Sequence, residues 1–181
     1  MPTDSQNEIR FLLDRLCRLA AAEEWTGDLN PSQYAALAYL ARANRFSRAP
    51  SQVAEYLAST RGTVSQTLKA LCRKGYVAEA RSETDRRSIS YVVTEAGLEA
   101  LRKAALFEQP LASYSDPEAT DLTHSMKLLL QRVLQSRGNR PFGICRECAH
   151  HRTRNDGRYC ALLEVKLKEA EAKQICFEQV S

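Results

Sequence analysis

The sequence lacks any long hydrophobic run. Nowhere do apolar residues continue unbroken for the ~18 positions that a membrane-spanning helix needs. The opening residues, MPTDSQNEIR, contain no basic stretch that leads into an apolar segment, as a secretion signal would. These absences argue against a membrane protein and against secretion. We therefore expect no membrane partner and a cytoplasmic location.

Sequence motifs of several enzyme classes are missing as well. The chain has no glycine-rich phosphate-binding loop and no HExxH-type zinc motif, and it shows no internal repeat or low-complexity tract. Its 181 residues, 27% charged and 44% hydrophobic, suit one globular domain with an appendage. A formal net charge of +4 permits a polyanionic partner without requiring one. We expect a binding protein and not an enzyme.

The spacing of apolar residues predicts a mainly helical chain. Apolar positions recur at helical intervals, and helix caps such as Asn30, followed by Pro31, mark the starts. The first and last helices carry more apolar surface than one small domain can cover, which favours a dimer. The helices expected outside the central motif span 5–25, 31–44, 94–112 and 118–136.

Residues 47–93 carry the pattern of a winged helix-turn-helix. A short helix begins at Pro50 and breaks at Ala58–Ser59, and a longer helix capped by Thr60 follows. Gly75 suits the left-handed residue that ends a helix. Two segments rich in β-branched and aromatic residues, 76–80 and 88–93, then flank a charged tip, which is typical of a β-hairpin. The predicted fold class is mainly α, an α+β winged helix.

The longer helix of this motif presents polar residues to the outside. Its apolar residues Val64, Leu68 and Leu71 are spaced to face inward, so the opposite side stays free. Arginine and glutamine can pair with base edges in the major groove, while threonine, serine and lysine can hold phosphates. The DNA contacts expected from this helix are Thr60, Arg61, Gly62, Thr63, Ser65, Gln66, Lys69 and Arg73.

The hairpin tip is the second expected DNA contact. Arg86 and Arg87 on a narrow ribbon can reach a minor groove, whose negative potential attracts guanidinium groups, with Asp85 orienting one of them. Eight basic and four acidic residues over 47–91 give this segment a net charge of +4, equal to that of the whole chain. A solvated surface would explain a polar helix face or a charged tip alone, but their order favours DNA binding.

Over about residues 8–137 the chain resembles the MarR-type transcriptional regulators. The resemblance rests on residues 29–37, on 53–57 followed by 63–71 and 74–77, and most specifically on the wing. There, Asp85-Arg86-Arg87 leads to Val93-Thr94-Glu95-Ala96-Gly97, and Val93 stands where the family usually has leucine. The resemblance implies that Arg87 enters the minor groove with Asp85 as its orienting carboxylate, and that residues 60–69 lie in the major groove.

The resemblance also implies an assembly and a mode of regulation. The family is dimeric through its terminal helices, so a homodimer is expected to read double-stranded DNA at a pseudo-palindromic operator, as a repressor. Many members bind a small phenolic or lipophilic effector between these helices and the DNA-binding lobe. Trp25, Tyr34, Tyr39 and Phe46 could line such a cleft, although aromatic residues at helical spacing are more often ordinary core.

The end of the chain is rich in cysteine, and the resemblance does not reach it. Cys145, Cys148, Cys160 and Cys176 lie close in sequence, and in a reducing compartment such a group more often holds metal than disulfides. A structural zinc ribbon has two CxxC knuckles, whereas this tail has one, with a helix expected over 162–174. A zinc ion and an iron–sulfur cluster therefore both stay open, as do free thiols.

Two other functions stay open. A winged helix can act as a protein–protein adaptor, and the CxxC pair could serve a thiol or redox protein, although it follows a linker and not the strand of a βαβ unit. The expected organisation is an N-terminal dimerisation helix, a winged-helix lobe, C-terminal dimerisation helices, and a linker with the cysteine-rich tail. These parts span 1–28, 29–94, 95–137 and 138–181.

Overall fold

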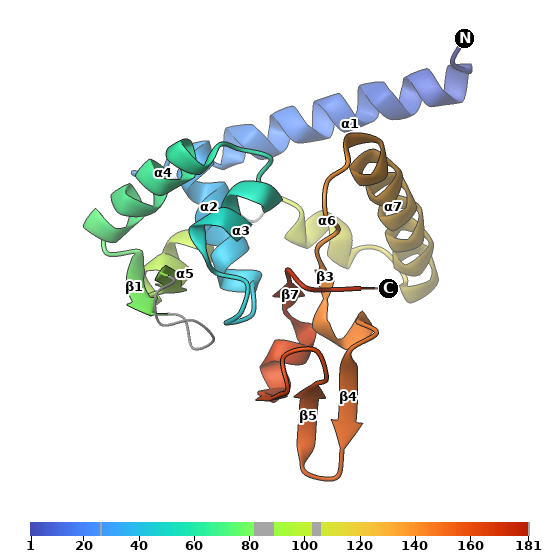
Figure 1. Cartoon of the computed structure of the whole chain (residues 1–181). Helices are drawn as coiled ribbons and strands as arrows, with labels where there is room; N and C mark the ends of the chain where they lie inside the picture. The colour runs from blue at the N-terminus through green and yellow to red at the C-terminus, as the bar shows by residue number, and fades with distance from the viewer. Residues whose placement is uncertain (26, 82–88, 103–105, 181) are drawn as a thin grey trace.

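The computed structural model shows a winged-helix lobe, two long helices and a small β-rich tail (Figure 1). It describes residues 1–25, 27–81, 89–102 and 106–180. The helices are α1 (Asp4–Glu23), α2 (Pro31–Arg42), α3 (Pro50–Tyr56), α4 (Arg61–Arg73), α5 (Glu95–Arg102), α6 (Glu108–Ala112) and α7 (Asp116–Arg137). The predicted fold class, mainly α with a winged helix-turn-helix, is confirmed.

Local capping explains where the central helices begin and end. The Asn30 side chain accepts a hydrogen bond of 2.9 Å from the backbone N–H of Gln33 at the start of α2. Thr60 accepts one of 3.2 Å from the N–H of Thr63 at the start of α4. Past the end of α4, Gly75 has a φ of 75°, which glycine adopts without the strain of a side chain. The caps predicted from the sequence are therefore confirmed.

The core of the lobe forms where α2, α3 and α4 meet. Leu37 and Leu40 of α2 are fully buried, and Val64, Leu68 and Leu71 of α4 are between 0% and 2% exposed. Burial of apolar area on this scale is the main favourable term in folding. The prediction that the apolar residues of α4 face inward is confirmed, and this orientation leaves the other side of α4 toward solvent.

The hairpin packs against the three central helices. Strands β1 (Val77–Arg81) and β2 (Ile89–Val93) pair antiparallel. The buried residue Tyr91 donates its backbone N–H to the carbonyl of Arg48 over 3.2 Å, which ties β2 to the segment before α3. The predicted wing contacts Asp85, Arg86 and Arg87 lie outside the described residues.

The single helix predicted over 94–112 is wrong. The structure has two separate helices here, α5 and α6, and Leu106 and Phe107 lie in a turn just before α6. Pro110 gives the physical reason. Its ring clashes with the carbonyl of the residue four positions earlier in a continuous helix, so it is tolerated only near a helix start.

The tail is built from short strands. Strand β3 (Gly143–Ile144) pairs with β7 (Ile175–Cys176), and β4 (His151–Arg154), β5 (Gly157–Cys160) and β6 (Val165–Leu167) form a three-stranded antiparallel sheet. Two short 3-10 helices, η1 (Cys145–Glu147) and η2 (Glu169–Lys173), complete it.

The helix predicted over 162–174 is also wrong. Glu164 has a φ of 56°, a left-handed conformation that an α-helix cannot contain. Val165 and Leu167 then follow the two-residue period of a strand and pair with β5. A charged segment without an apolar stripe at helical spacing has little to gain from forming a helix here.

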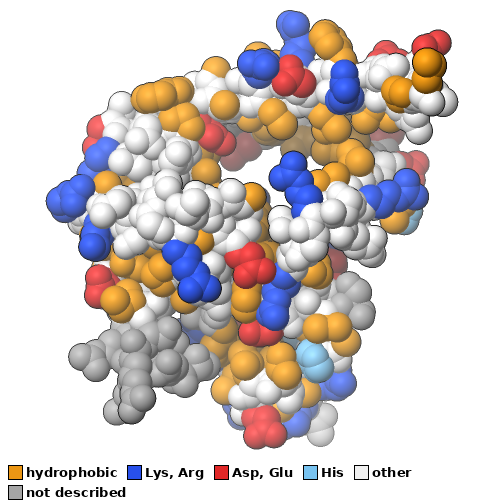
Figure 2. All heavy atoms as spheres, turned by 45° about the horizontal axis from the view of Figure 1, so that its top comes forward, with side chains coloured by type: hydrophobic (Ala, Val, Ile, Leu, Met, Phe, Trp, Pro, Cys, Tyr) orange, Lys and Arg blue, Asp and Glu red, His pale blue; other side chains and the backbone are white. Residues whose placement is uncertain are grey.

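The helices α1 and α7 extend beyond the lobe and contain no buried residue. Their apolar side chains are nevertheless large, and Figure 2 shows hydrophobic side chains lying open along α1. Among the described residues, no helix is both long enough and apolar enough to cross a membrane. The exposed apolar residues on the two helices include Ile9, Phe11, Leu12, Leu16, Leu19, Leu122, Met126, Leu128, Leu130 and Val133.

Candidate functional site

The outer face of α4 gathers the polar residues predicted to contact DNA. Seven of these eight residues are exposed to solvent, and Ser65 is half-buried. Because they lie along the side of α4 opposite its buried residues, they form one continuous surface of hydroxyl, amide and cationic groups. The seven exposed residues are Thr60, Arg61, Gly62, Thr63, Gln66, Lys69 and Arg73.

The start of α4 is suited to an anion. The hydroxyls of Thr60 and Thr63 lie 2.8 Å apart, and Thr67 donates its hydroxyl to the carbonyl of Thr63 over 3.0 Å. The first N–H groups of a helix have no carbonyl partner within it, and the helix dipole adds a partial positive charge at this end. Phosphate oxygens are favourable partners for such groups, and Arg61 adds a full positive charge in the first turn.

The turn between α3 and α4 fixes the direction of α4. Ala58 adopts a φ of 48°, and Ser59 donates its backbone N–H to the carbonyl of Ala54 over 2.9 Å. This closed turn lies at the break that the sequence predicted. Since the buried side of α4 packs on α2 and α3, the turn leaves the helix little freedom to rotate.

The far end of α4 is tied to the start of α2 by polar contacts. Tyr76 donates its hydroxyl to Asp28 over 2.7 Å, and Lys74 lies 3.4 Å from the same carboxylate and donates to Gln33 over 2.9 Å. The hydrogen bond from Tyr76, assisted by the charge of Lys74, lowers the pKa of Asp28. Lys74 therefore has a structural role, unlike the exposed cations on the outer face.

The four tail cysteines, which lie on separate short elements, come close to one another in the structure. Cys145 donates its backbone N–H over 3.0 Å to the carbonyl of Gln174, two residues before Cys176, and Cys148 donates its own to the carbonyl of Cys145 over 3.1 Å. Cys160 lies opposite His151 in the β4–β5 pair. Cys145 and Cys176 are buried in one small apolar cluster, against which Cys160 packs. We call these four side chains the thiol cluster.

The environment of the thiol cluster favours neutral thiols when no metal is present. Burial, together with the nearby Cys176, Cys160 and Cys148, raises the pKa of Cys145 to about 12. Burial also raises the pKa of Cys176, although the Asn44 side chain beside its sulfur opposes this shift. Within the described residues, no three His, Cys, Asp or Glu side chains form a group that could hold a metal ion as they stand.

The tail is joined to the lobe by contacts that the sequence analysis missed. Ile175 is buried in the lobe core and forms a parallel bridge with Ala43, while its carbonyl accepts the N–H of Asn44 over 2.9 Å. The backbone N–H of Phe177 donates to the Ser47 hydroxyl over 2.8 Å. These partners lie about 130 positions apart, so no local pattern could have revealed them.

One ion pair strengthens the same junction. Arg45 contacts Glu171 over 2.6 Å, and the two side chains are 20% and 6% exposed. Arg45 also donates to the carbonyl of Lys166 over 2.8 Å. Such partly buried, charge-assisted bonds hold two elements in a defined geometry. The tail is therefore a packed part of the molecule in this structure.

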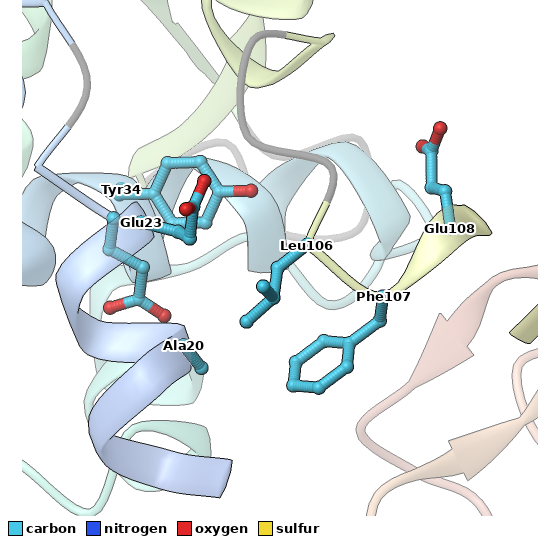
Figure 3. A pocket seen from close by; sticks show the side chains of 7 residues that line it. Ala20, Glu23, Tyr34, Leu106, Phe107 and Glu108 are labelled. Atoms are coloured by element: carbon cyan, nitrogen blue, oxygen red, sulfur yellow. The ribbon is translucent and has the colours of Figure 1, made fainter. Parts of the chain in front are cut away.

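A small cavity lies between α1, α2 and the turn before α6 (Figure 3). Its volume is about 190 Å³, and Tyr34 and Ala20 face Leu106 and Phe107 across it, while the side chain of Glu108 extends away from them. Of the aromatic residues that could line an effector cleft, Tyr34 lines this cavity. Tyr39 is fully buried core, Phe46 packs against the thiol cluster, and Trp25 is 70% exposed.

Comparisons with known proteins agree with this geometry. Residues 27–88 match the model of the MarR family. Among solved structures, Streptococcus pneumoniae FabT in complex with DNA is 25% identical with a TM-score of 0.54, and the match covers 73% of this chain and 99% of FabT. A MarR transcriptional regulator from Methanosarcina mazei Go1 is 23% identical with a TM-score of 0.56, over 71% of this chain and 98% of its own.

A third structure shares the fold at lower identity. Sco3205 from Streptomyces coelicolor, a MarR family transcriptional regulator in complex with DNA, is 17% identical with a TM-score of 0.56, over 74% of this chain and 94% of its own. No curated protein matches the chain. The tail lies beyond the residues that match the family model. The lobe is thus similar to the MarR family over residues 27–88, and it shares the fold of MarR transcriptional regulators of known structure.

Proposed function

We propose that this protein binds double-stranded DNA as a homodimer and represses transcription from the operator that it covers. The observation that carries the proposal is the outer face of α4, where cationic and amide side chains project from a helix whose opposite side is fully buried. A helix fits the major groove of DNA, and these residue types pair with bases and phosphates there. The DNA-bound FabT, which shares the fold, supports the same use of the lobe.

The proposed homodimer rests on α1 and α7. In the described chain these helices bury no residue, yet each carries a stripe of large apolar side chains, with Phe11 63% and Leu130 55% exposed. A contiguous apolar surface of this kind marks a protein interface, because leaving it in water is unfavourable. A second copy of the chain supplies a matching stripe by two-fold symmetry.

A two-fold dimer predicts the form of the operator. Two copies of α4 would enter successive major grooves, so the operator should be a pseudo-palindrome with half-sites about 10 base pairs apart. The wing would add a minor-groove contact through Arg87, a role that rests on the resemblance alone. Repression would follow because a bound dimer denies polymerase access to a promoter that overlaps the operator.

A selection from random duplex DNA, followed by affinity measurements, tests the DNA-binding proposal. The selected sequences should contain a pseudo-palindrome, and affinity should fall steeply as salt rises because phosphate contacts release counterions. Arg61→Ala should weaken binding. Lys69→Ala should weaken it too, and should reduce the slope of log affinity against log salt concentration by about one, the value for one phosphate contact. Arg154→Ala in the tail strand β4 is the matched control and should bind as the native protein does.

The same experiment separates DNA binding from the adaptor alternative. An adaptor would select no DNA sequence, and neither Arg61→Ala nor Arg87→Ala would change its weak binding to duplexes. That result would contradict the proposed function. A reporter gene placed behind the selected operator then tests the sign of regulation, with lower expression expected when the protein is present.

Sedimentation tests the dimer independently of DNA. Leu12→Glu together with Leu16→Glu places charge in the apolar stripe of α1 and should shift the protein toward monomer. Asp14→Asn on the same helix is the control, because the ion pair of Asp14 with Arg18 is exposed. A native protein that sediments as a monomer at all accessible concentrations would contradict the homodimer.

A small-molecule effector is the third part of the proposal. The cavity beside Tyr34 is lined by the apolar Leu106 and Phe107, and the carboxylates of Glu23 and Glu24 lie at its α1 side. Burial raises the pKa of Glu24, so a cationic group nearby would be favourable to it. We therefore expect a small amphiphile with one positive charge. Tyr34→Ala should remove the effect of such a ligand on DNA affinity while leaving the unliganded affinity unchanged.

A further inference from the structure

We propose that Cys145, Cys148, Cys160 and Cys176 bind a metal through four thiolates, and that the bound metal holds β7 against the winged-helix lobe. Four thiolates are the ligand set of structural zinc sites and of iron–sulfur clusters alike. The shared chemistry is a soft, thiol-bound metal centre, and the experiment below distinguishes its two forms.

The first argument is convergence. The four cysteines come from separate parts of the tail: Cys145 begins η1, Cys148 follows it, Cys160 ends β5 and Cys176 ends β7. Three of them nevertheless share one buried cluster, and backbone hydrogen bonds place Cys148 beside it. Cys17 and Cys72 lie elsewhere, on α1 and α4. The tail fold therefore brings together all the cysteines that it contains.

The second argument is a hydrogen bond that points at sulfur. The backbone N–H of His150 donates to the Cys148 sulfur over 3.5 Å. An N–H aimed at sulfur stabilises a thiolate more than a thiol, and a thiolate is the form that binds metal.

The third argument is a buried donor beside Cys176. Asn44 comes from the lobe, is only 1% exposed and lies next to the Cys176 sulfur. Within the described residues, its amide nitrogen Nδ2 has no hydrogen-bond partner that satisfies normal geometry. A buried polar atom without a partner is costly, so its position calls for an explanation. A metal-bound thiolate at Cys176 would be an acceptor for it.

Metal binding requires a change in the thiol cluster. The four cysteines must lose their protons and draw together, since no group of three is already arranged to hold an ion. The four thiols are all free in the structure, so no disulfide has to be broken first. Binding releases protons and replaces the contacts of neutral thiols by metal–sulfur bonds of ~2.3 Å.

The position of β7 connects the thiol cluster to the lobe. Cys176 follows Ile175, whose side chain is buried in the lobe core, and the next residue, Phe177, donates to Ser47. Residues 43–48 lead from α2 into α3, and the carbonyl of Arg48 accepts the N–H of β2 at Tyr91. A metal that fixes Cys176 therefore fixes the segment that leads into α3, the first helix of the DNA-reading motif.

The test begins with the metal content of the full-length protein purified without oxygen. Elemental analysis, sulfide analysis and the visible spectrum should show either one zinc ion per chain or iron with acid-labile sulfide and a brown colour. Either result supports the four-thiolate centre and identifies its form. A protein that contains neither, and takes up neither Zn²⁺ nor Fe²⁺ with sulfide after reduction, overturns it.

Variants then assign the ligands. Cys148→Ser and Cys176→Ser should each lose most of the metal, whereas the double variant Cys17→Ser/Cys72→Ser should keep all of it. The double variant contains only the four tail cysteines. Alkylation of its thiols therefore tests the ligands even if the single variants fail to fold. Its thiols should resist alkylation until a chelator removes the metal. Loss of metal in this variant, or full occupancy in both single variants, would overturn the ligand assignment.

Hydrogen exchange tests the link to the lobe without using DNA. Removal of the metal should speed exchange at Asn44 and Phe177, whose N–H groups bridge lobe and tail, and leave the amides of α1 unchanged. Unchanged exchange at both bridging amides would overturn the link. Because neither measurement uses an operator, failure here and failure of the proposed DNA binding can be told apart.

Discussion

The winged-helix lobe and the tail are stabilised by different means. The lobe has a continuous apolar core in which α2 and α4 bury their leucines completely. The tail buries few apolar side chains of its own, chiefly Leu167 and Ala172 beside two cysteines, and its sheets have only two or three strands. A segment of this size rarely folds with so small an apolar core. Comparable natural domains are stabilised in addition by a cross-link such as a bound metal.

The tail is held in place at two points. Ile175 inserts into the lobe core, with the ion pair between Arg45 and Glu171 at its edge, and this joins the tail to the lobe. The thiol cluster joins η1, β5 and β7 to one another within the tail. The lobe can tolerate loss of polar contacts because its core remains, whereas the tail depends on them. Substitutions in the two regions should therefore act differently.

The largest effect is expected from Leu68→Ala in the lobe. Leu68 is fully buried, so its truncation removes apolar contacts and leaves a cavity, which costs about 2–5 kcal/mol in the free energy of unfolding. Urea denaturation at fixed protein concentration measures this loss. Leu162→Ala in the tail is the control, since Leu162 is 45% exposed and should change stability by less than about 0.5 kcal/mol. Equal effects would contradict the view that the core stabilises the lobe.

The junction should respond next in size. Glu171→Gln removes the negative charge that contacts the partly buried Arg45 and weakens the acceptor for the N–H of Lys168, at a cost of about 1–3 kcal/mol. Hydrogen exchange should rise in the tail and stay unchanged in α4. Glu169→Gln is matched to it, because Glu169 is 73% exposed in its pair with Arg158 and should matter little. Faster exchange in α4 would mean that the two regions unfold together.

The sequence was sufficient for the lobe because its signals are local. Asn30 with Pro31, Thr60 and Gly75 mark helix ends within a few residues, and the spacing of Val64, Leu68 and Leu71 gives the buried side of α4. These features are enough to place the helix-turn-helix and its outer face. The break that Pro110 imposes is also local, and its presence would have justified dividing the helix predicted over 94–112.

The tail could not be predicted in the same way. Its strands are two to four residues long, too short for a period to emerge, and the bridge from Ala43 to Ile175 joins distant parts of the chain. The four cysteines did indicate that the segments holding them would meet. They did not reveal that the meeting point lies against the lobe, because that depends on Ile175 fitting into a core built by other residues.

A smaller effect is expected at the cap of α4. Thr60→Ala removes the side-chain acceptor for the N–H of Thr63 and should cost about 1 kcal/mol in the free energy of unfolding. Thr60→Ser keeps the acceptor and should restore most of this loss. If Thr60 also contacts phosphate, Thr60→Ala should cost more in the free energy of DNA binding than in the free energy of unfolding. Unfolding and binding titrations on the same two variants separate these roles, and identical values for Thr60→Ala and Thr60→Ser would contradict the cap.

The smallest effects come from a matched pair of backbone positions. Ala58 in the lobe and Glu164 in the tail are the non-glycine residues with positive φ in the described chain. Glycine relieves the strain of this conformation, so each change to glycine should raise local stability by about 0.5–1 kcal/mol. Ala58→Gly should raise the unfolding midpoint of the lobe, because it relieves strain in the turn that sets the direction of α4. Glu164→Gly should slow exchange only in β5 and β6 if the tail opens separately, and a rise in the lobe midpoint instead would show that lobe and tail form one cooperative unit.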